Sequence, residues 1–406
     1  MKITTELLGE HPDLTSIECD LPISGTWIRG GEGFIGFGVY RQITVSGPKR
    51  FLDAQNWWRE QLHQLDIKNS VHGSGTGPIL FASFAFDENE PSVLTFPDVV
   101  VAKKGSKSWI TWLGESQPEL RAATRITTGQ EFSWSKGALG DIAWCERVEE
   151  AVRRITAGEL EKVVLARDEV ATSDQVIDPR SLIQSLQEEY PSTWVYFVDG
   201  LVGATPELLV RLNKTLVTSR VLAGTIRRSG DEERDLLLAG SLAKSSKDLE
   251  EHEYAVRSVA QALAPFASST NVPEAPFVLH LPNVMHLATD VTGVINDSVE
   301  RVDIFAITAA LHPSAAVCGT PTDRARSVID EIESMNRGRY AGPVGWIDAH
   351  GDGEFGIALR CGQISADEKS ITLYAGCGIV AGSQPELELA ESQAKLAPVK
   401  SALTRL

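Results

Sequence analysis

The chain has 406 residues, of which 42% are apolar and 23% charged, a composition typical of a globular protein with a large core and not of a disordered chain. Its formal net charge of −17 would repel a phosphate backbone, so nucleic acid is not an expected partner. The opening segment lacks the apolar run of a secretory signal, no stretch is long enough to span a bilayer, and the five cysteines include no C-x-x-C pair. We therefore expect a cytoplasmic protein without a membrane partner, a disulfide framework or a zinc ribbon.

Residues 114–140 form a polar stretch that separates a glycine- and aromatic-rich first part, residues 1–113, from a motif-dense remainder, residues 141–406. Composition does not show whether this stretch divides two domains or two halves of one fold. In the first part, Gly31, Gly33 and Gly36 match the dinucleotide-binding spacing G-x-G-x-x-G. That motif needs a strand that turns into a helix, whereas the residues after Gly36 favour a strand, so we predict a β-turn here.

After the polar stretch, helical and strand patterns alternate. Apolar residues spaced three and four apart predict helices over residues 141–156, 231–266 and 385–403. Apolar and β-branched runs predict strands over residues 160–170, 201–212, 215–225, 340–348, 355–364 and 370–380. Asn213 and Lys214 are predicted to form the turn of a hairpin. Because short turns join successive strands, we predict an α+β fold with antiparallel sheets and not a doubly wound parallel sheet.

The C-terminal helix carries a charged face. Glu388 and Glu391 are three residues apart, and Glu391 and Lys395 are four apart, so all three lie on one side of the helix. Residues 247–253 form a second acidic cluster on a predicted helix. Each cluster taken alone is typical of a solvated helix face. Two such helices that met across a pocket would, however, offer the oxygen ligands that Mg²⁺ prefers.

Two charged residues are unusual for their surroundings. Lys162 stands at the start of a predicted strand, and Glu207 interrupts an otherwise apolar one. As structural residues they would be strand-end charges near solvent. As catalytic residues they would form a complementary pair, because a neutral lysine can take a proton from water and a glutamic acid kept protonated by an apolar site can donate one.

From about residue 140 to the C-terminus, the sequence resembles the chorismate-utilising enzymes, and the residues before 114 do so only loosely. The family includes isochorismate synthases, salicylate synthases, the large subunit of anthranilate synthase and aminodeoxychorismate synthase. The matching segments are LEKVVLAR (160–167), GATPELLV (203–210), VLAGTIRR (221–228), AKSSKDLEEHEYAV (243–256), VMHLATDVTG (284–293), LHPSAAVCGTP (311–321), YAGPVGWID (340–348), ALRCG (358–362), YAGCGIV (374–380) and ESQAK (391–395).

The resemblance implies one domain over residues 1–406, with two opposed, mainly antiparallel sheets flanked by helices and a cleft for Mg²⁺ and chorismate. By motif position it implies that Glu251 and Glu391 bind the metal with help from Glu388, that Lys162 is the base, and that Glu207 is the acid. It also implies substrate contacts, which fall on Gly224, Thr225, His286, Arg360, Gly378 and Lys395.

Three positions bear on which reaction of the family is expected. Ammonia-using relatives usually carry Gln where this chain has Lys162, and aminodeoxychorismate synthases carry a nucleophilic Lys where it has Ala223. Relatives that eliminate pyruvate commonly carry Thr where it has Ala316. The resemblance therefore implies an isochorismate synthase, which adds water to chorismate with loss of the ring hydroxyl. It is expected to need Mg²⁺ and to act as a monomer without a glutaminase subunit.

Other activities within the resemblance stay open. A salicylate synthase would share Lys162 and add pyruvate elimination, whereas an anthranilate synthase would need a glutaminase partner. A non-catalytic chorismate-binding protein would need neither Lys162 nor Glu207. Menaquinone biosynthesis and siderophore biosynthesis are both compatible with isochorismate as the product.

Overall fold

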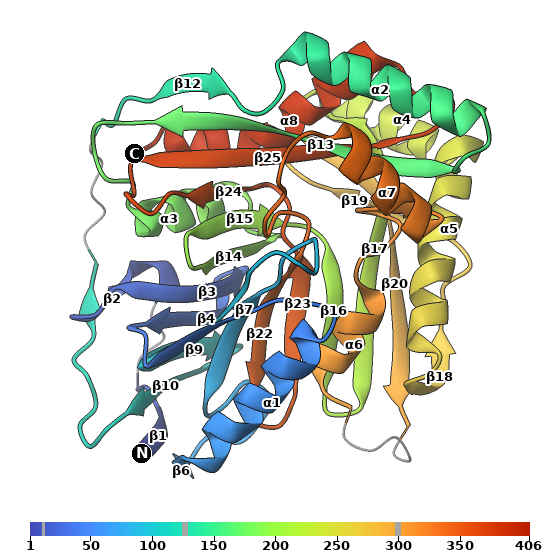
Figure 1. The fold of residues 1–406 in the computed structure, drawn as a ribbon. Coiled ribbons are helices and arrows are strands. Elements are labelled where there is room, and N and C mark those ends of the chain that lie inside the picture. Colours follow the sequence, from blue (N-terminus) through green and yellow to red (C-terminus); the bar gives the residue numbers. More distant parts are fainter. Residues whose placement is uncertain (10–12, 124–128, 297–301) are drawn as a thin grey trace.

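The computed structural model describes residues 1–9, 13–123, 129–296 and 302–406, except for the side chains of Lys247 and Glu251. Two large sheets with helices packed around them make up the fold (Figure 1). All strand pairs of both sheets are antiparallel except β1 with β6 in the described residues. The predicted α+β class, with two antiparallel sheets flanked by helices, is confirmed.

The first sheet has thirteen strands within the described ranges. In spatial order they are β12 (Ser133–Lys136), β13 (Lys162–Thr172), β25 (Ser370–Ile379), β24 (Cys361–Ile364), β15 (Leu201–Thr205), β14 (Trp194–Val198), β3 (Ile23–Arg29), β4 (Glu32–Phe37), β9 (Val99–Lys104), β10 (Lys107–Leu113), β1 (Lys2–Leu7) and β6 (Asp66–Asn69), and β21 (Gly319–Thr320) also pairs with β13. Strands from both ends of the chain therefore share one sheet.

The second sheet has ten strands in the part of the chain that is described. In spatial order they are β18 (Ala267–Asn271), β20 (Val284–Ile295), β17 (Leu216–Arg227), β16 (Leu208–Asn213), β23 (Gly353–Ile357), β22 (Pro343–Asp348), β7 (Ile79–Ser83), β8 (Ser92–Phe96) and β5 (Arg41–Val45), and β19 (Phe277–His280) also pairs with β20. A short pair, β2 (Ile17–Glu18) with β11 (Arg121–Ala122), lies apart from both sheets, and a 3₁₀ turn, η1 (Leu14–Ser16), precedes β2.

The helices cover the sheets. They are α1 (Arg50–His63), α2 (Asp141–Thr156), α3 (Pro179–Glu189), α4 (Glu232–Leu242), α5 (Ser246–Leu263), α6 (Ile304–Leu311), α7 (Thr322–Ile332) and α8 (Pro385–Leu403). Helices α2 and α8 pack on β13 and β25 of the first sheet, whereas α5 packs on β17 and β20 of the second (Figure 1). The acidic helix α8 and the acidic cluster of α5 thus belong to different sheets.

Two segments that we predicted as single strands change sheet halfway. Residues 201–212 form β15 in the first sheet and β16 in the second, with Pro206 and Glu207 between them. Proline has no N–H for a strand ladder, so the pairing stops there. Residues 355–364 likewise form β23 and then β24, with Arg360 at a φ of +51° between them. The prediction of one strand in each case was wrong, and each break is a crossover between the sheets.

Other predictions agree with the structure more closely. Helices α2 and α8 have the predicted bounds, residues 141–156 and 385–403. The predicted hairpin of β16 and β17 is present, but it turns at Lys214 and Thr215, one residue later than predicted, because Asn213 pairs with Leu216. The predicted helix over residues 231–266 is instead two helices, because Ser245 accepts a hydrogen bond from the backbone of Asp248 and so caps a new helix. Gly30 and Gly31, with φ of +60° and +75°, form the turn between β3 and β4. A β-turn near the glycine motif is therefore confirmed.

Aromatic side chains join the two parts of the sequence in one core. Phe84, which follows β7, lies against Phe305 of α6 and Phe355 of β23, with ring centroids 5.6 and 6.1 Å away. Phe305 and Phe355 also contact each other, at 5.7 Å. All three are buried in a hydrophobic cluster that contains residues from both sides of the polar stretch.

We predict that Phe355→Ala destabilises the protein by about 3–5 kcal/mol, because it leaves a cavity among the rings of Phe84 and Phe305. The shift of the urea unfolding midpoint measures this loss. Leu216→Ala, on β17, is the control, because that side chain is 49% exposed and its removal should change stability by no more than about 0.5 kcal/mol. Equal midpoints for the two variants would contradict the prediction.

Candidate active site

A cavity of about 180 Å³ lies where the two sheets approach each other. Its walls come from β13 and β25 of the first sheet, β17 and β20 of the second, helix α8 and both crossovers. The predicted site residues that line it are Lys162, Glu207, Gly224, Thr225, His286, Arg360, Gly378, Glu388, Glu391 and Lys395. The remaining one, Glu251, belongs to α5, but its side chain lies outside the described residues.

The two crossovers hold each other and so place an acid next to a cation. The backbone oxygen of Glu207 accepts from Ile357 N at 3.2 Å, and the backbone oxygen of Arg360 accepts from Ala204 N at 3.2 Å. The N–H of Glu207 donates to Thr205 Oγ1 at 3.2 Å. Both side chains line the same cavity because the segments that carry them cross between the sheets together.

Burial sets the protonation of Glu207. Glu207 is 7% exposed, and loss of solvation raises the pKa of its carboxyl to about 7. The positive charges of Lys162, Arg360 and Lys395 act to lower this pKa but do not outweigh burial. At neutral pH a large fraction of the molecules therefore hold a proton on this side chain. A carboxylic acid in this state can donate a proton to a bound ligand.

Lys162 is the first residue of β13, and Thr320 of β21 is its partner in the sheet. Its side chain lines the cavity together with Glu207. Lys162 and Val380 also line a second, more apolar pocket of about 700 Å³. The lysine therefore lies at the boundary between two pockets.

A neutral histidine faces the cavity from β20. Burial lowers the pKa of His286 to about 3, and the charges of Arg360 and Lys395 add to the effect. Its Nδ1 is 3.0 Å from Thr225 Oγ1, whereas its buried Nε2 has no hydrogen-bond partner in the described residues. A bulge in β17 at Gly224, with a φ of +76°, brings Thr225 opposite His286. This pair can offer a polar contact to an uncharged group of a ligand.

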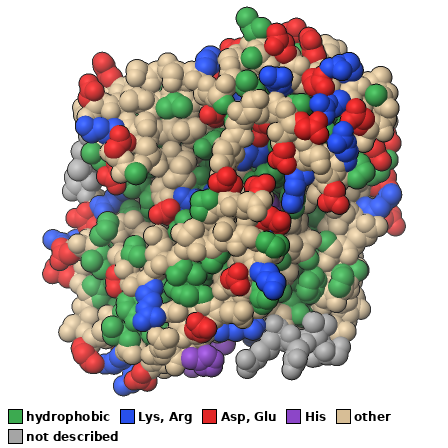
Figure 2. Space-filling model, viewed as in Figure 1, with side chains coloured by type: hydrophobic (Ala, Val, Ile, Leu, Met, Phe, Trp, Pro, Cys, Tyr) green, Lys and Arg blue, Asp and Glu red, His purple; other side chains and the backbone are tan. Residues whose placement is uncertain are grey.

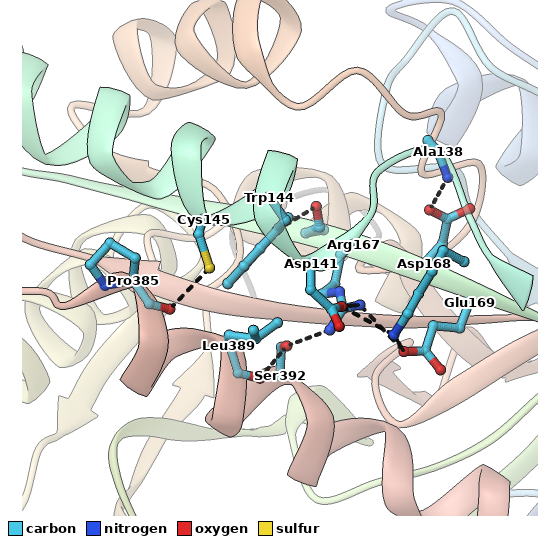
Figure 3. A network of polar contacts seen from close by, with 12 residues as sticks. Ala138, Asp141, Trp144, Cys145, Arg167, Asp168, Glu169, Pro385, Leu389 and Ser392 are labelled. Carbon is cyan, nitrogen blue, oxygen red and sulfur yellow. Dashed lines mark hydrogen bonds and ion pairs between the residues drawn. The ribbon is translucent and has the colours of Figure 1, made fainter.

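A buried arginine holds α8 and α2 against β13 (Figure 3). Arg167 Nη2 donates to Asp141 Oδ1 at 2.5 Å and to Glu169 Oε1 at 3.3 Å, and Nη1 donates to Ser392 Oγ at 3.4 Å. Asp141 begins α2, and Ser392 lies in α8 directly after Glu391. The contact with Ser392 therefore helps to fix the rotation of α8 that turns its acidic face to the cavity.

The acidic face of α8 fits a hard divalent cation. Oxygens of Glu388 and Glu391 and the sulfur of Cys377 lie within 4.8 Å of one another. Carboxylate oxygens suit Mg²⁺. The thiol of Cys377 does not, because burial raises its pKa and its Sγ donates to the backbone oxygen of Glu388 at 3.3 Å. Cys377 thus anchors α8 to β25, and the two glutamates are the candidate ligands.

Lys395 completes this face of α8. Its Nζ lies 2.6 Å from Glu391 Oε1 and donates to the backbone oxygen of Gly376 at 2.8 Å. Burial acts to lower the pKa of the ammonium, but Glu391 and Cys377 outweigh it, so the net shift is upward. Lys395 therefore stays protonated and, with Arg360, gives the cavity two cationic side chains.

Sequence reasoning missed two cavity residues that carry polar groups. Asp248, in the first turn of α5, lines the cavity, and its Cβ lies 3.1 Å from the place where a Cβ on Gly224 would stand. Its spacing of three from Glu251 on one helix was a signal that could have found it. Tyr340 also lines the cavity, is buried, and stacks on Tyr374 with ring centroids 5.3 Å apart. It begins the matching segment 340–348, but nothing in the local pattern of that segment pointed to the cavity.

On the face shown in Figure 2, basic and acidic side chains are intermixed. Among the helices of the described residues, none is both long and apolar enough to cross a membrane.

The fold and this cavity identify the class of protein: the chain belongs to the chorismate-binding enzymes, whose family model matches residues 28–404. It is 36% identical over 395 residues to isochorismate synthase MenF of Bacillus subtilis, covering 89% of this chain and 83% of that protein. It is 41% identical over 259 residues to isochorismate synthase DhbC of the same species, covering 61% of this chain and 64% of that protein.

Solved structures agree with the fold. The crystal structure of DhbC from Bacillus anthracis matches with a TM-score of 0.80 and 29% identity, over 95% of this chain and 97% of that one. MenF from Escherichia coli, described as a menaquinone-specific isochorismate synthase, matches with a TM-score of 0.80 over 99% of this chain and 94% of that one. At 23% identity, the second likeness shows the fold alone.

We predict that the carboxyl of Glu207 titrates near pH 7 in the free protein. Arg360→Met should raise this pKa further, because it removes a positive charge that stabilises the carboxylate. ¹³C NMR of protein labelled at glutamate Cδ measures both values, and loss of the signal in Glu207→Gln assigns it. A titration near the ordinary value of 4.5 would contradict the burial argument.

Proposed function

We propose that this chain is an isochorismate synthase, which converts chorismate to isochorismate by adding water to the ring while a ring hydroxyl leaves. The observation that carries the proposal is that Lys162 and Glu207 line one cavity with two cationic side chains. Membership of the chorismate-binding enzymes and the names of relatives such as DhbC, MenF and EntC support it.

Binding of the dicarboxylate falls to Arg360 and Lys395. A guanidinium can donate to both oxygens of one carboxylate, and an ammonium can act as a point charge for the other. Arg360 is 8% exposed and the Lys395 side chain 12% exposed, so little water screens their charge in the cavity wall. The uncharged ring of His286, paired with Thr225, offers a contact to a ring hydroxyl without adding charge.

The chemistry needs a base and an acid at separate positions of the ring. Lys162 in its neutral form accepts a proton from the attacking water, whose oxygen forms a bond to one ring carbon. Glu207 donates its proton to the hydroxyl that leaves another ring carbon, so that a water molecule departs. Each such transfer typically contributes about 10²–10⁴-fold to the rate. A pKa of about 7 suits Glu207 to this role, because the protonated acid is then abundant at neutral pH.

The proposal includes a Mg²⁺ requirement. Glu388 and Glu391 of α8 would hold the ion, with Glu251 of α5 as the third carboxylate that the resemblance implies, and Asp248 also lines this cavity. When bound, Mg²⁺ would supply positive charge for a substrate carboxylate.

The wall of the cavity supports a reaction that stops at isochorismate. Ala316, at the position where pyruvate-eliminating relatives commonly carry Thr, lines the cavity. Its methyl group offers no hydroxyl to the substrate. We therefore favour isochorismate over salicylate with pyruvate as the product.

We further propose that the enzyme acts in the cytoplasm as a monomer without a glutaminase subunit. Its product would feed menaquinone or siderophore biosynthesis. The protein from Pseudomonas aeruginosa is described as a salicylate biosynthesis isochorismate synthase, and E. coli MenF, whose likeness shows the fold alone, as menaquinone-specific.

Incubation of the purified protein with chorismate and Mg²⁺ is expected to yield isochorismate, identified by chromatography. We predict that Lys162→Ala and Glu207→Ala abolish this turnover, because each removes one of the two proton transfers. Lys104→Ala, at the exposed end of β9, is the control that should keep full activity. Circular dichroism checks that the variants fold.

Salicylate with pyruvate as the main product would instead identify a salicylate synthase. Absence of any product, with chorismate still bound, would identify a binding protein. Normal rates in either the Lys162 or the Glu207 variant would remove the role assigned to that residue.

We predict that Glu391→Ala raises the Mg²⁺ concentration needed for half-maximal activity, because one of the candidate oxygen ligands is lost. Glu388→Ala should shift it in the same direction. Titration of activity with Mg²⁺ at saturating chorismate measures the shift. Glu386→Ala, in the first turn of α8 and absent from the cavity lining, is the matched control. An unchanged titration in both site variants would contradict the assignment.

A further inference from the structure

Strand β13, which carries Lys162, has one edge that other strands cover only in part. The fully covered edge of β13 pairs with β25 along residues 163–172. At the other edge β21 covers residues 162–163 and β12 covers residues 169–172. Backbone groups of alternate residues between these two segments, at Val164, Ala166 and Asp168, face this edge. In a buried strand such groups need partners from elsewhere.

Two buried side chains supply the partners that a neighbouring strand would otherwise give. Glu333, at the end of α7, accepts a hydrogen bond from Ala166 N, with its Oε2 2.8 Å away. Arg337 Nη2 donates to the backbone oxygen of Val164 at a distance of 2.7 Å. The two side chains also form a double contact, with Nε to Oε1 at 2.7 Å and Nη2 to Oε2 at 2.5 Å. Both are at most 3% exposed.

Helix α2 supplies another hydrogen-bond donor to the same edge of β13. Trp144 donates from Nε1 to the backbone oxygen of Ala166 at 3.2 Å (Figure 3). The N–H of Val164 donates to the backbone oxygen of Cys318 at 2.8 Å. All backbone groups of Val164 and Ala166 at this edge are therefore paired, and the Glu333–Arg337 pair provides two of the four partners.

Arg337 also holds the segment that lies next to the start of β13. Its Nη1 donates to the backbone oxygen of Val317 at 3.0 Å. Val164 and Val317 both line the cavity, and Lys162 and Ala316 are close to them in the chain. One guanidinium thus ties the strand of the base to the segment that carries Ala316. Neither Glu333 nor Arg337 is among the residues that line the cavity.

We propose that Glu333 and Arg337 form a positioning pair for Lys162. They fix β13 against the segment of residues 314–318 and so set the place of the base relative to a ligand held in the cavity. The role of the base rests on the proposed function. The pair acts through Val164, Ala166 and Val317, and it depends on the planar fork of arginine, which reaches Glu333 and two carbonyl oxygens at once and which lysine cannot reproduce.

The test compares two buried arginines that differ in what they hold. Arg337→Lys is expected to lower kcat by about 10- to 100-fold, because a displaced base no longer meets the attacking water in line. The KM for chorismate should change by less than about threefold, because Arg360 and Lys395 are untouched. Arg339→Lys is the matched control, since Arg339 is also buried and donates to the backbone oxygens of Val198 and Asp199, which lie away from the cavity lining.

Thermal unfolding of both variants separates stability from position. We expect similar losses of melting temperature for Arg337→Lys and Arg339→Lys but a loss of kcat for the first alone. An equal effect on kcat in the two variants, or a raised KM with unchanged kcat for Arg337→Lys, would overturn the positioning role.

A second pair of variants tests the contact with Ala166 and stands in if Arg337→Lys fails to fold. Glu333→Gln keeps an oxygen that can accept from Ala166 N, whereas Glu333→Leu keeps similar volume without an acceptor. We expect the kcat of Glu333→Gln to be larger than that of Glu333→Leu. The KM of both variants should stay near that of the wild type. Equal losses would show that the hydrogen bond does not position the strand.

Isochorismate formation by the wild type is measured first. If it is absent, the proposed function fails before the variants are compared. If it is present and the variants do not follow the expected order, only the positioning pair fails.

Discussion

The site depends on one constraint, which is that the chain crosses between the two sheets twice at the same place. The links between β15 and β16 and between β23 and β24 are joined by backbone hydrogen bonds, Ile357 N to Glu207 O and Ala204 N to Arg360 O. A crossover leaves a strand ladder, so its side chains can turn into the space between the sheets. Glu207 is buried for this reason, and its burial is the cause of its raised pKa. Acid strength and position thus have the same structural origin.

The charges around the cavity are arranged for a ligand more than for stability. Burial of Arg360 and Lys395 carries a desolvation cost that well-packed apolar side chains would avoid. The carboxylate of Glu391 offsets the desolvation of the Lys395 ammonium, and the pKa of Lys395 is raised. The negative neighbours of Arg360 offset its desolvation less, so burial lowers the pKa of its guanidinium. A dianionic ligand would supply the missing negative charge. In a protein with a net charge of −17, Arg360 and Lys395 give an anionic substrate local positive charge.

The sequence was sufficient where local chemistry decides the structure. The bounds of α2 and α8 follow from apolar spacing, with Pro385 at the start of α8, and the motif positions led to residues that share one cavity. It failed where a strand passes from one sheet to another, because apolar alternation continues through the crossover, and only Pro206 and the φ of Arg360 mark the breaks. Asp248 and the Glu333–Arg337 pair were missed for a related reason. The partners of a buried charge come from distant parts of the chain, and one sequence does not reveal which of its charges are buried.

Strand β13 connects these features. Its start carries Lys162, its middle is paired by Glu333 and Arg337, and Arg167 further along joins it to Ser392, beside the acidic face of α8. Buried arginines therefore hold both the base and the candidate metal ligands in place relative to β13. Because a guanidinium donates in several fixed directions at once, each arginine couples two or three elements and not a single pair. A shift of β13 would move the base and loosen α8 together, so the strand is the element whose rigidity keeps the two halves of the site in register.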